Sequence, residues 1–244
     1  MANWSDPRSD IAGFGGATAA RGAAFDAGLR SYMLSVYNYM ASGVLLTGVV
    51  ALLFASSGLA AAVFTGPGIL KYVVMFAPLL FVMVLSFGIN RLSTVAAQGL
   101  FWAYAAVMGV SLSYIFLAYT GTSIAQTFFA TAAAFAGLSL WGYTTKKDLS
   151  GFGTFLIMGV VGLLVASLIN IFMQSNAMSL VISGVGVLLF AGLTAYDTQK
   201  IKSIYAQVAG TDMMGKSVVM GALNLYLDFI NMFMFLLRLF GDRR

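Results

Sequence analysis

The sequence predicts an all-α membrane protein with seven transmembrane helices. Hydrophobic residues make up 60% of the 244 residues and charged residues only 9%, whereas a soluble domain carries about 25% charged residues. Long segments contain no charge at all: 31–70, 72–90, 92–145 and 149–196. Because the chain has too little polar surface to cover a water-facing globule, the apolar excess must face lipid.

Polar and glycine-rich segments divide these uncharged stretches into single spans of about 20 residues. Segments 56–58 and 66–68 bound a loop after the first span, 120–123 divides the third stretch, and 174–176 divides the fourth. The expected helices, in order, cover residues 32–55, 70–89, 96–118, 124–144, 152–173, 178–200 and 215–238.

Three regions follow from this division. Residues 1–30 are rich in Gly, Ala, Asp and Arg with little periodicity, which predicts a flexible cytoplasmic tail with room for a short interfacial helix at its end. Residues 31–240 form the seven-helix domain, and residues 241–244 form a short basic tail. Small residues four apart, Gly109 with Ser113 and Ala132 with Ala136, predict close helix packing.

The basic residues predict the orientation, because cytoplasmic loops carry an excess of Lys and Arg. Four basic residues fall on one side of the seven spans, namely Lys71, Arg238, Arg243 and Arg244. The majority falls on the other side, which is therefore predicted to be cytoplasmic together with the N-terminus: Arg8, Arg21, Arg30, Arg91, Lys146, Lys147, Lys200, Lys202 and Lys216. The C-terminal arginines then lie outside against the rule, unless the last segment is broken or re-entrant.

Composition also excludes several classes of function. The chain has no Cys, no His and no Glu, which removes thiolate chemistry, zinc–sulfur sites and Ser–His–Asp catalysis. No phosphate-binding glycine loop or dinucleotide fingerprint is present, so we expect neither a cofactor nor an enzyme. The excess of Lys and Arg in the predicted cytoplasmic loops explains the net charge of +5. We therefore expect no nucleic-acid partner.

Three charged residues stand where charge is costly. Asp228 lies in the middle of the seventh span, Asp197 at the end of the sixth apolar run, and Arg91 at the end of the second. An acid near the bilayer centre costs about 2.5–3.5 kcal/mol and normally faces the interior of the bundle, where it has a partner. Asp228 therefore indicates a functional site, whereas Arg91 by itself is typical of a charge that sets topology.

Spacing connects the two acids. The midpoint between Asp197 and Asp228 falls in the turn-like segment 210–215. If the last two helices form an antiparallel hairpin about this turn, both acids lie at about the same depth, roughly 20 Å from it. Asn224 and Asn231 share the helix face of Asp228, which is typical of a helix that lines a polar cavity or, alternatively, of one that makes interhelical hydrogen bonds.

Two carboxylates close together in a low dielectric cannot both ionise easily, and they titrate as a coupled pair that can share one proton. Without His, such a pair is the strongest candidate for a pH sensor in this chain. Arg91 or a cation could compete with the proton. Because Ca²⁺ prefers about 6–8 oxygens, Asp197 and Asp228 with amide oxygens and waters would make a weak and transient Ca²⁺ site, as conduction requires.

Around these residues the chain resembles the Bax inhibitor-1 family of transmembrane proteins, specifically its bacterial branch. The similarity lies in Ala195-Tyr196-Asp197-Thr198-Gln199-Lys200-Ile201 and Leu225-Tyr226-Leu227-Asp228-Phe229-Ile230-Asn231, with further matches at 87–91 and 146–150. It covers the chain from about residue 25 to its end. The two Asp motifs together are specific, whereas either one alone would be a weak signal.

The resemblance implies a bundle in which the last helix is central and surrounded by the other six. It implies a multi-pass protein of the bacterial inner membrane that acts as a pH-sensitive Ca²⁺ leak channel. The family's proton-sensing aspartate pair corresponds to Asp197 and Asp228, and its latching arginine to Arg91. The lipid bilayer, Ca²⁺ and protons are then the expected partners.

Two alternative functions remain open. The resemblance extends to bacterial relatives that bind a membrane-bound AAA protease, which implies a non-transporting membrane regulator of a protease or stress response. A more remote alternative is an intramembrane aspartyl protease with two membrane acids. Presenilin-like proteases carry Gly-x-Gly-Asp at the second acid, whereas this chain has Leu225-Tyr226-Leu227-Asp228 and lacks a Pro-Ala-Leu motif.

Overall fold

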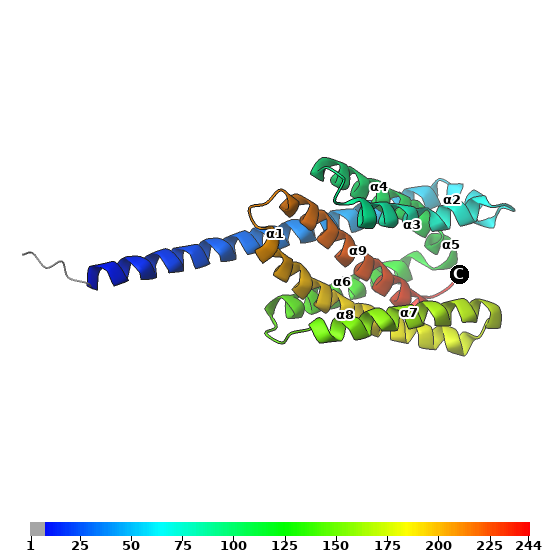
Figure 1. Ribbon diagram of the computed structural model, residues 1–244. Helices are drawn as coiled ribbons and strands as arrows, with labels where there is room; N and C mark the ends of the chain where they lie inside the picture. The colour runs from blue at the N-terminus through cyan, green and yellow to red at the C-terminus, as the bar shows by residue number, and fades with distance from the viewer. Residues whose placement is uncertain (1–7) are drawn as a thin grey trace, which may run out of the picture.

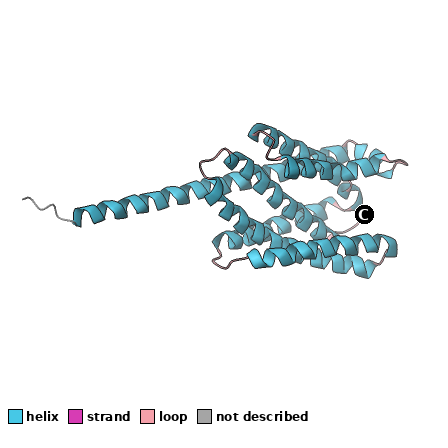
Figure 2. Cartoon of the chain, in the orientation of Figure 1, coloured by secondary structure: helices cyan, strands magenta, loops and turns pink. Residues whose placement is uncertain are grey.

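The computed structural model describes the backbone of residues 8–244 and side-chain environments from residue 23 onward (Figures 1 and 2). This part of the chain is helical, apart from turns and one isolated bridge between Tyr119 and Arg243, which confirms the all-α class. The helices are α1 (Arg8–Ser56), α2 (Leu59–Thr65), α3 (Leu70–Gly88), α4 (Thr94–Leu112), α5 (Ile115–Ala118), α6 (Gly121–Thr144), α7 (Ser150–Met173), α8 (Asn176–Val208) and α9 (Met213–Phe240).

Seven segments of the described chain are long and apolar enough to cross a membrane, as predicted. Their bounds lie close to the expected ones, although the first and sixth extend further and the third runs through α4 and α5. The outer helices α3 and α7 carry mostly exposed large apolar side chains, such as Phe76 and Leu80 on α3 and Phe155 and Leu164 on α7. Such apolar faces are expected to contact lipid, because their exposure to water would be energetically unfavourable.

The N-terminal part of the chain differs from expectation. Residues 8–30, expected in a flexible tail, belong to α1, while residues 1–7 lie outside the described part. Alanines favour helix here, and no proline interrupts the chain between Pro7 and Pro67. The loop expected after the first span contains the short helix α2, whose alanine-rich sequence again favours helix, and Gly58 at φ 80° separates it from α1.

A proline inside α3 is compensated by the neighbouring helix α4. Pro78 has no N–H, so it cannot donate to the carbonyl of Val74, four residues earlier. The Ser111 hydroxyl on α4 donates to that carbonyl at 2.8 Å. A backbone carbonyl in the hydrocarbon region needs such a partner, so this bond ties α3 to α4.

The last helix α9 occupies the centre of the bundle. Figure 1 shows it running between the group of α2, α3 and α4 and the group of α6, α7 and α8. It packs mainly against α1, α4, α6 and α8, whereas α3 packs chiefly on α4 and α7 chiefly on α8. In the most apolar stretch of each span, 67% of the residues of α9 are buried, against 11–39% for the other six.

One of the two small-residue pairs packs as expected. A Cβ at Gly109 on α4 would collide with Thr47 and Val50 on α1, so glycine permits this close approach. The other prediction was wrong, because Ala132 and Ala136 line an open groove between α1 and α6. These two helices both pack on α9, which holds their facing sides apart.

The C-terminal helix is continuous, which excludes the broken or re-entrant alternative. Helix α9 runs without interruption to Phe240, and the last residues pack at the end of the bundle near α5 (Figure 1). There the Thr120 N–H donates to the Asp242 carbonyl at 3.0 Å, and the Arg244 N–H donates to the Ala118 carbonyl at 3.1 Å. The N-terminal and C-terminal ends of the described chain therefore lie at opposite ends of the helical bundle. Which end faces the cytoplasm remains a prediction.

Candidate functional site

Helices α8 and α9 form the predicted antiparallel hairpin. Only four residues join them, and Gly210 adopts φ 74°, a conformation that glycine accepts without strain. Gly221 on α9 lies against Ile201 on α8, and further along Gly186 on α8 lies against Phe235 on α9. In this register Asp197 is opposite residues 224–225, so the two acids are offset by about one helical turn, or roughly 5 Å along the axis.

The Asp228 side chain points into the interior of the bundle. It is 4% exposed, and its Oδ2 atom has no hydrogen-bond partner among the described residues. Asp197 is half-buried and lies within electrostatic range of Asp228, so two ionised carboxylates would repel each other. The charge of Lys200, one turn after Asp197, acts in the opposite direction on Asp197. The structure therefore places the two predicted acids on facing helices at nearly the same depth.

The two asparagines flank Asp228 on the same helix, and both are half-buried. The Asn231 amide nitrogen donates to the Leu227 carbonyl of its own helix at 2.8 Å. That bond supports the structural interpretation of Asn231, although it uses only the nitrogen and leaves the amide oxygen as the atom that could meet a cation.

Arg91 stands apart from the acids. It is exposed in the connection between α3 and α4, next to Asn90, whose carbonyl accepts a hydrogen bond from Lys216 Nζ at 3.5 Å. Lys216 precedes Asp228 by twelve residues on α9, which corresponds to about 18 Å along the helix axis. The structure does not place Arg91 at the acidic pair, and its role as a latch stays a prediction.

Hydrogen bonds to α1 and α4 fix the rotation of α9. The Tyr226 hydroxyl, two residues before Asp228, bonds Thr47 Oγ1 on α1 at 2.7 Å, and Thr47 donates to the Ala105 carbonyl on α4 at 2.8 Å. Near the start of α9, Ser217 bonds the Tyr32 hydroxyl at 2.6 Å. Because these bonds hold one side of α9 against α1 and α4, the Asp228 side turns toward α8.

Sequence reasoning missed the contact that fixes α8 beside the site. Ser139 on α6 and Thr198, the residue after Asp197, are both buried and bond each other at 3.3 Å. Close approach of these helices depends on Gly142, where a Cβ would collide with the Ala195 backbone. A Ser and a Thr inside apolar runs were a visible signal, but the sequence alone does not show that they meet.

The connection between α6 and α7 contains an acid that, unlike Asp228, is exposed. Asp148 is exposed and accepts a bond from the Ser150 N–H at 2.9 Å at the start of α7. Hydrogen bonds from the Ser150 side chain and backbone lower the pKa of Asp148 below its ordinary value. Asp148 therefore stays ionised throughout the neutral range, which excludes it as a sensor of neutral pH.

The donor set of the described residues does not suit a tightly held cation. Among the described residues, no group of three or more acidic, His or Cys side chains could hold a metal ion. Tight Ca²⁺ sites usually use several carboxylates among 6–8 oxygen ligands. Asp197 and Asp228 offer two carboxylates on facing helices, with the amide oxygens of Asn224 and Asn231 nearby on α9.

Comparisons with known proteins agree with this arrangement of helices. The family model for the inhibitor of apoptosis-promoting Bax1 matches residues 29–244. The chain is 48% identical to an uncharacterized protein of Rickettsia prowazekii over 230 residues, which cover 93% of this chain and 96% of the relative. It is 46% identical to inner membrane protein YbhL of Escherichia coli over 220 residues, which cover 89% of this chain and 94% of the relative. This seven-helix membrane protein belongs to the Bax inhibitor family.

Proposed function

We propose that the protein is a pH-sensitive Ca²⁺ leak channel whose gate is the pair of Asp197 and Asp228. The observation that carries the proposal is the buried, partly unpartnered carboxylate of Asp228 on the central helix, with the Asp197 charge within electrostatic range. An acid in this position is costly in a membrane unless it binds a proton or a cation. The role is non-enzymatic, and Ca²⁺ is the transported ion.

The charges around the pair set the direction of the pH effect. Asp197 acts on Asp228 by repulsion, and Lys200 acts on Asp197 by attraction. With one shared proton the repulsion is small, so α8 and α9 stay together and the path is closed. Loss of that proton at higher pH adds repulsion and creates affinity for a cation. A few kcal/mol is enough to shift such a two-state equilibrium, so Ca²⁺ flux rises with pH.

We further propose that the protein lies in the bacterial inner membrane with its N-terminus in the cytoplasm. The relative from E. coli is named an inner membrane protein. The loops that carry the basic residues support this orientation. Hydrogen bonds between Lys216 and Asn90, and between Gln199 and Lys147, hold these loops at one end of the bundle, and cytoplasmic loops carry an excess of Lys and Arg.

The test is Ca²⁺ entry into proteoliposomes at several pH values. Wild type is expected to conduct more Ca²⁺ as the pH rises, and Asp228→Asn is expected to conduct with a flat pH profile. Asp148→Asn makes the same chemical change at an exposed acid that stays ionised at neutral pH, so it should keep the wild-type profile. The side-chain oxygen of Asn can accept the same bond from the Ser150 N–H, so this control should fold normally.

Two results would contradict the proposal. One is an Asp228→Asn profile identical to that of wild type. The other is wild-type flux equal to that of protein-free liposomes at every pH, which would favour the non-transporting regulator that binds a membrane protease.

A further inference from the structure

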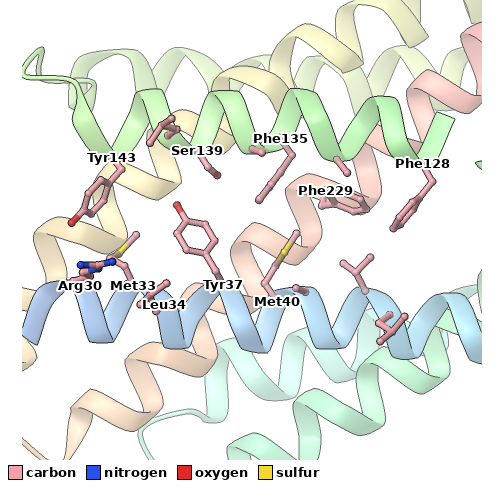
Figure 3. A pocket seen from close by; sticks show the side chains of 16 residues that line it. Arg30, Met33, Leu34, Tyr37, Met40, Phe128, Phe135, Ser139, Tyr143 and Phe229 are labelled. Atoms are coloured by element: carbon pink, nitrogen blue, oxygen red, sulfur yellow. The ribbon is translucent and has the colours of Figure 1, made fainter. Parts of the chain in front are cut away.

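A long groove opens between α1 and α6 and has no role in the proposed gate. Its volume is about 690 Å³, and Phe229 of α9 forms its floor. Figure 3 shows α1 along one side and α6 along the other, with Phe229 behind them. The rings of Phe128 and Phe135 each lie 5.6 Å from that of Phe229, so the floor is aromatic.

The groove is apolar along most of its length and polar at one end. Met40 and Phe135 lie along the middle, and Phe128 lies toward the far end (Figure 3). Arg30 and Tyr143 lie together at the other end. A second positive charge is present at that end, because Lys202 Nζ donates to the Tyr143 carbonyl at 2.8 Å and sits 4.9 Å from the Tyr143 ring centroid.

The polar end lies at the level expected for the membrane interface. Arg30 is the last charged residue before the uncharged stretch 31–70, and Tyr143 stands one residue before the end of α6. Tyrosine and arginine are the side chains expected at the level of the lipid headgroups. The apolar part of the groove then extends from this level into the hydrocarbon region.

The length of the groove fits one leaflet. On α1 its lining runs from Arg30 to Leu45, which spans about 22 Å of helix. One leaflet of hydrocarbon is about 15 Å deep, so the groove is long enough for an acyl chain anchored at Arg30 to follow it through the whole leaflet. Exposed side chains such as Leu34 and Leu140 border the opening, which faces laterally toward lipid.

We propose that this groove binds an anionic phospholipid. One acyl chain lies on Phe229 between α1 and α6, and the headgroup phosphate meets Arg30, with Lys202 adding positive potential. Apolar contact alone gives no preference over bulk lipid, so selectivity comes from the cationic end. A basic residue near the membrane surface contributes about 1 kcal/mol toward anionic lipid, which corresponds to a preference of about fivefold. The inference does not depend on Ca²⁺ transport.

The experiment is photo-crosslinking in nanodiscs followed by peptide mapping. Phosphatidylglycerol and phosphatidylcholine probes, each with a diazirine in one acyl chain, are compared at equal content in the whole protein. Adducts on α1 and α6 groove residues should favour phosphatidylglycerol by about fivefold. Adducts on the outer face of α7, around Phe155 and Leu164, should show no such preference and serve as the internal reference.

Variants separate the headgroup from the acyl chain. Arg30→Gln should remove most of the preference, and Arg30→Lys should retain it. Ala136→Phe fills the groove and should abolish adducts there. Ala134→Phe adds the same bulk on the opposite, exposed side of α6 and should leave the adducts unchanged.

Three outcomes would overturn the inference. They are equal labelling of the groove by both probes, groove labelling that persists in Ala136→Phe, and an absence of groove adducts with both probes, which is the result expected if a second copy of the chain fills the groove.

Discussion

Two buried tyrosines that meet between α4 and α9 differ in a single hydrogen bond. Tyr226 bonds Thr47, whereas the Tyr104 hydroxyl is buried without a partner among the described residues, and the two rings meet edge to face at 5.3 Å. Tyr226→Phe should therefore cost about 1 kcal/mol of folding free energy, because it removes a net favourable bond. Tyr104→Phe should be neutral or stabilising, because it removes a buried hydroxyl that has no partner.

Thermal unfolding of the two variants in the same detergent measures this difference. We expect a lower midpoint for Tyr226→Phe only. An equal loss of stability in Tyr104→Phe would mean that its hydroxyl binds a water molecule or an ion inside the bundle, and it would refute the assignment of Tyr104 as an unsatisfied group.

At the residue scale the sequence identified the acids but not their surroundings. Asp228 is conspicuous in any apolar run because its desolvation is costly. Equal spacing from the middle of the segment 210–215 predicted that Asp197 would lie at a similar depth, and the register agrees to about one turn. The direction of the Asp228 side chain depends on long-range bonds such as Tyr226 with Thr47, and no local pattern encodes them.

At the scale of elements, Ser111 and Pro78 form a testable pair. Ser111→Ala leaves the Val74 carbonyl without its donor at 2.8 Å, and we expect a cost of about 1–3 kcal/mol. In a Pro78→Ala background, the new N–H of residue 78 can donate to Val74 within α3, so the same change at Ser111 should cost much less. A double-mutant cycle of unfolding free energies measures this coupling. Equal costs in both backgrounds would refute the compensation.

The ends of the helices could be predicted only where polar capping residues interrupt the apolar sequence. The breaks at 120–123 and 174–176 were found because Thr120 and Ser175 cap the following helices, where each accepts a backbone N–H. Helix α1 extends past its expected start because polar residues end a membrane span without ending a helix. The groove could not be predicted at all, since it results from how far α9 separates α1 from α6.

At the scale of the whole molecule, the predicted orientation is accessible to labelling because the chain contains no cysteine. Asp212→Cys lies in the connection between α8 and α9, and Thr122→Cys lies at the start of α6; both positions are exposed. Because α6 and α8 each cross the membrane once, as does α7 between them, these positions lie on opposite sides.

A membrane-impermeant maleimide added to intact spheroplasts should label Thr122→Cys and leave Asp212→Cys unlabelled until the membrane is permeabilised. The reverse pattern would place the N-terminus outside and contradict the positive-inside argument.

A double-mutant cycle of Ca²⁺ flux against pH tests whether Asp197 and Asp228 act as one gate that holds one proton. Wild type, Asp197→Asn, Asp228→Asn and the double variant are reconstituted at equal density. If the two carboxylates share a proton, either single change removes the rise of flux with pH, and the double variant behaves like the single ones. Independent, additive effects of the two changes, or a pH profile that survives in the double variant, would contradict a shared-proton gate.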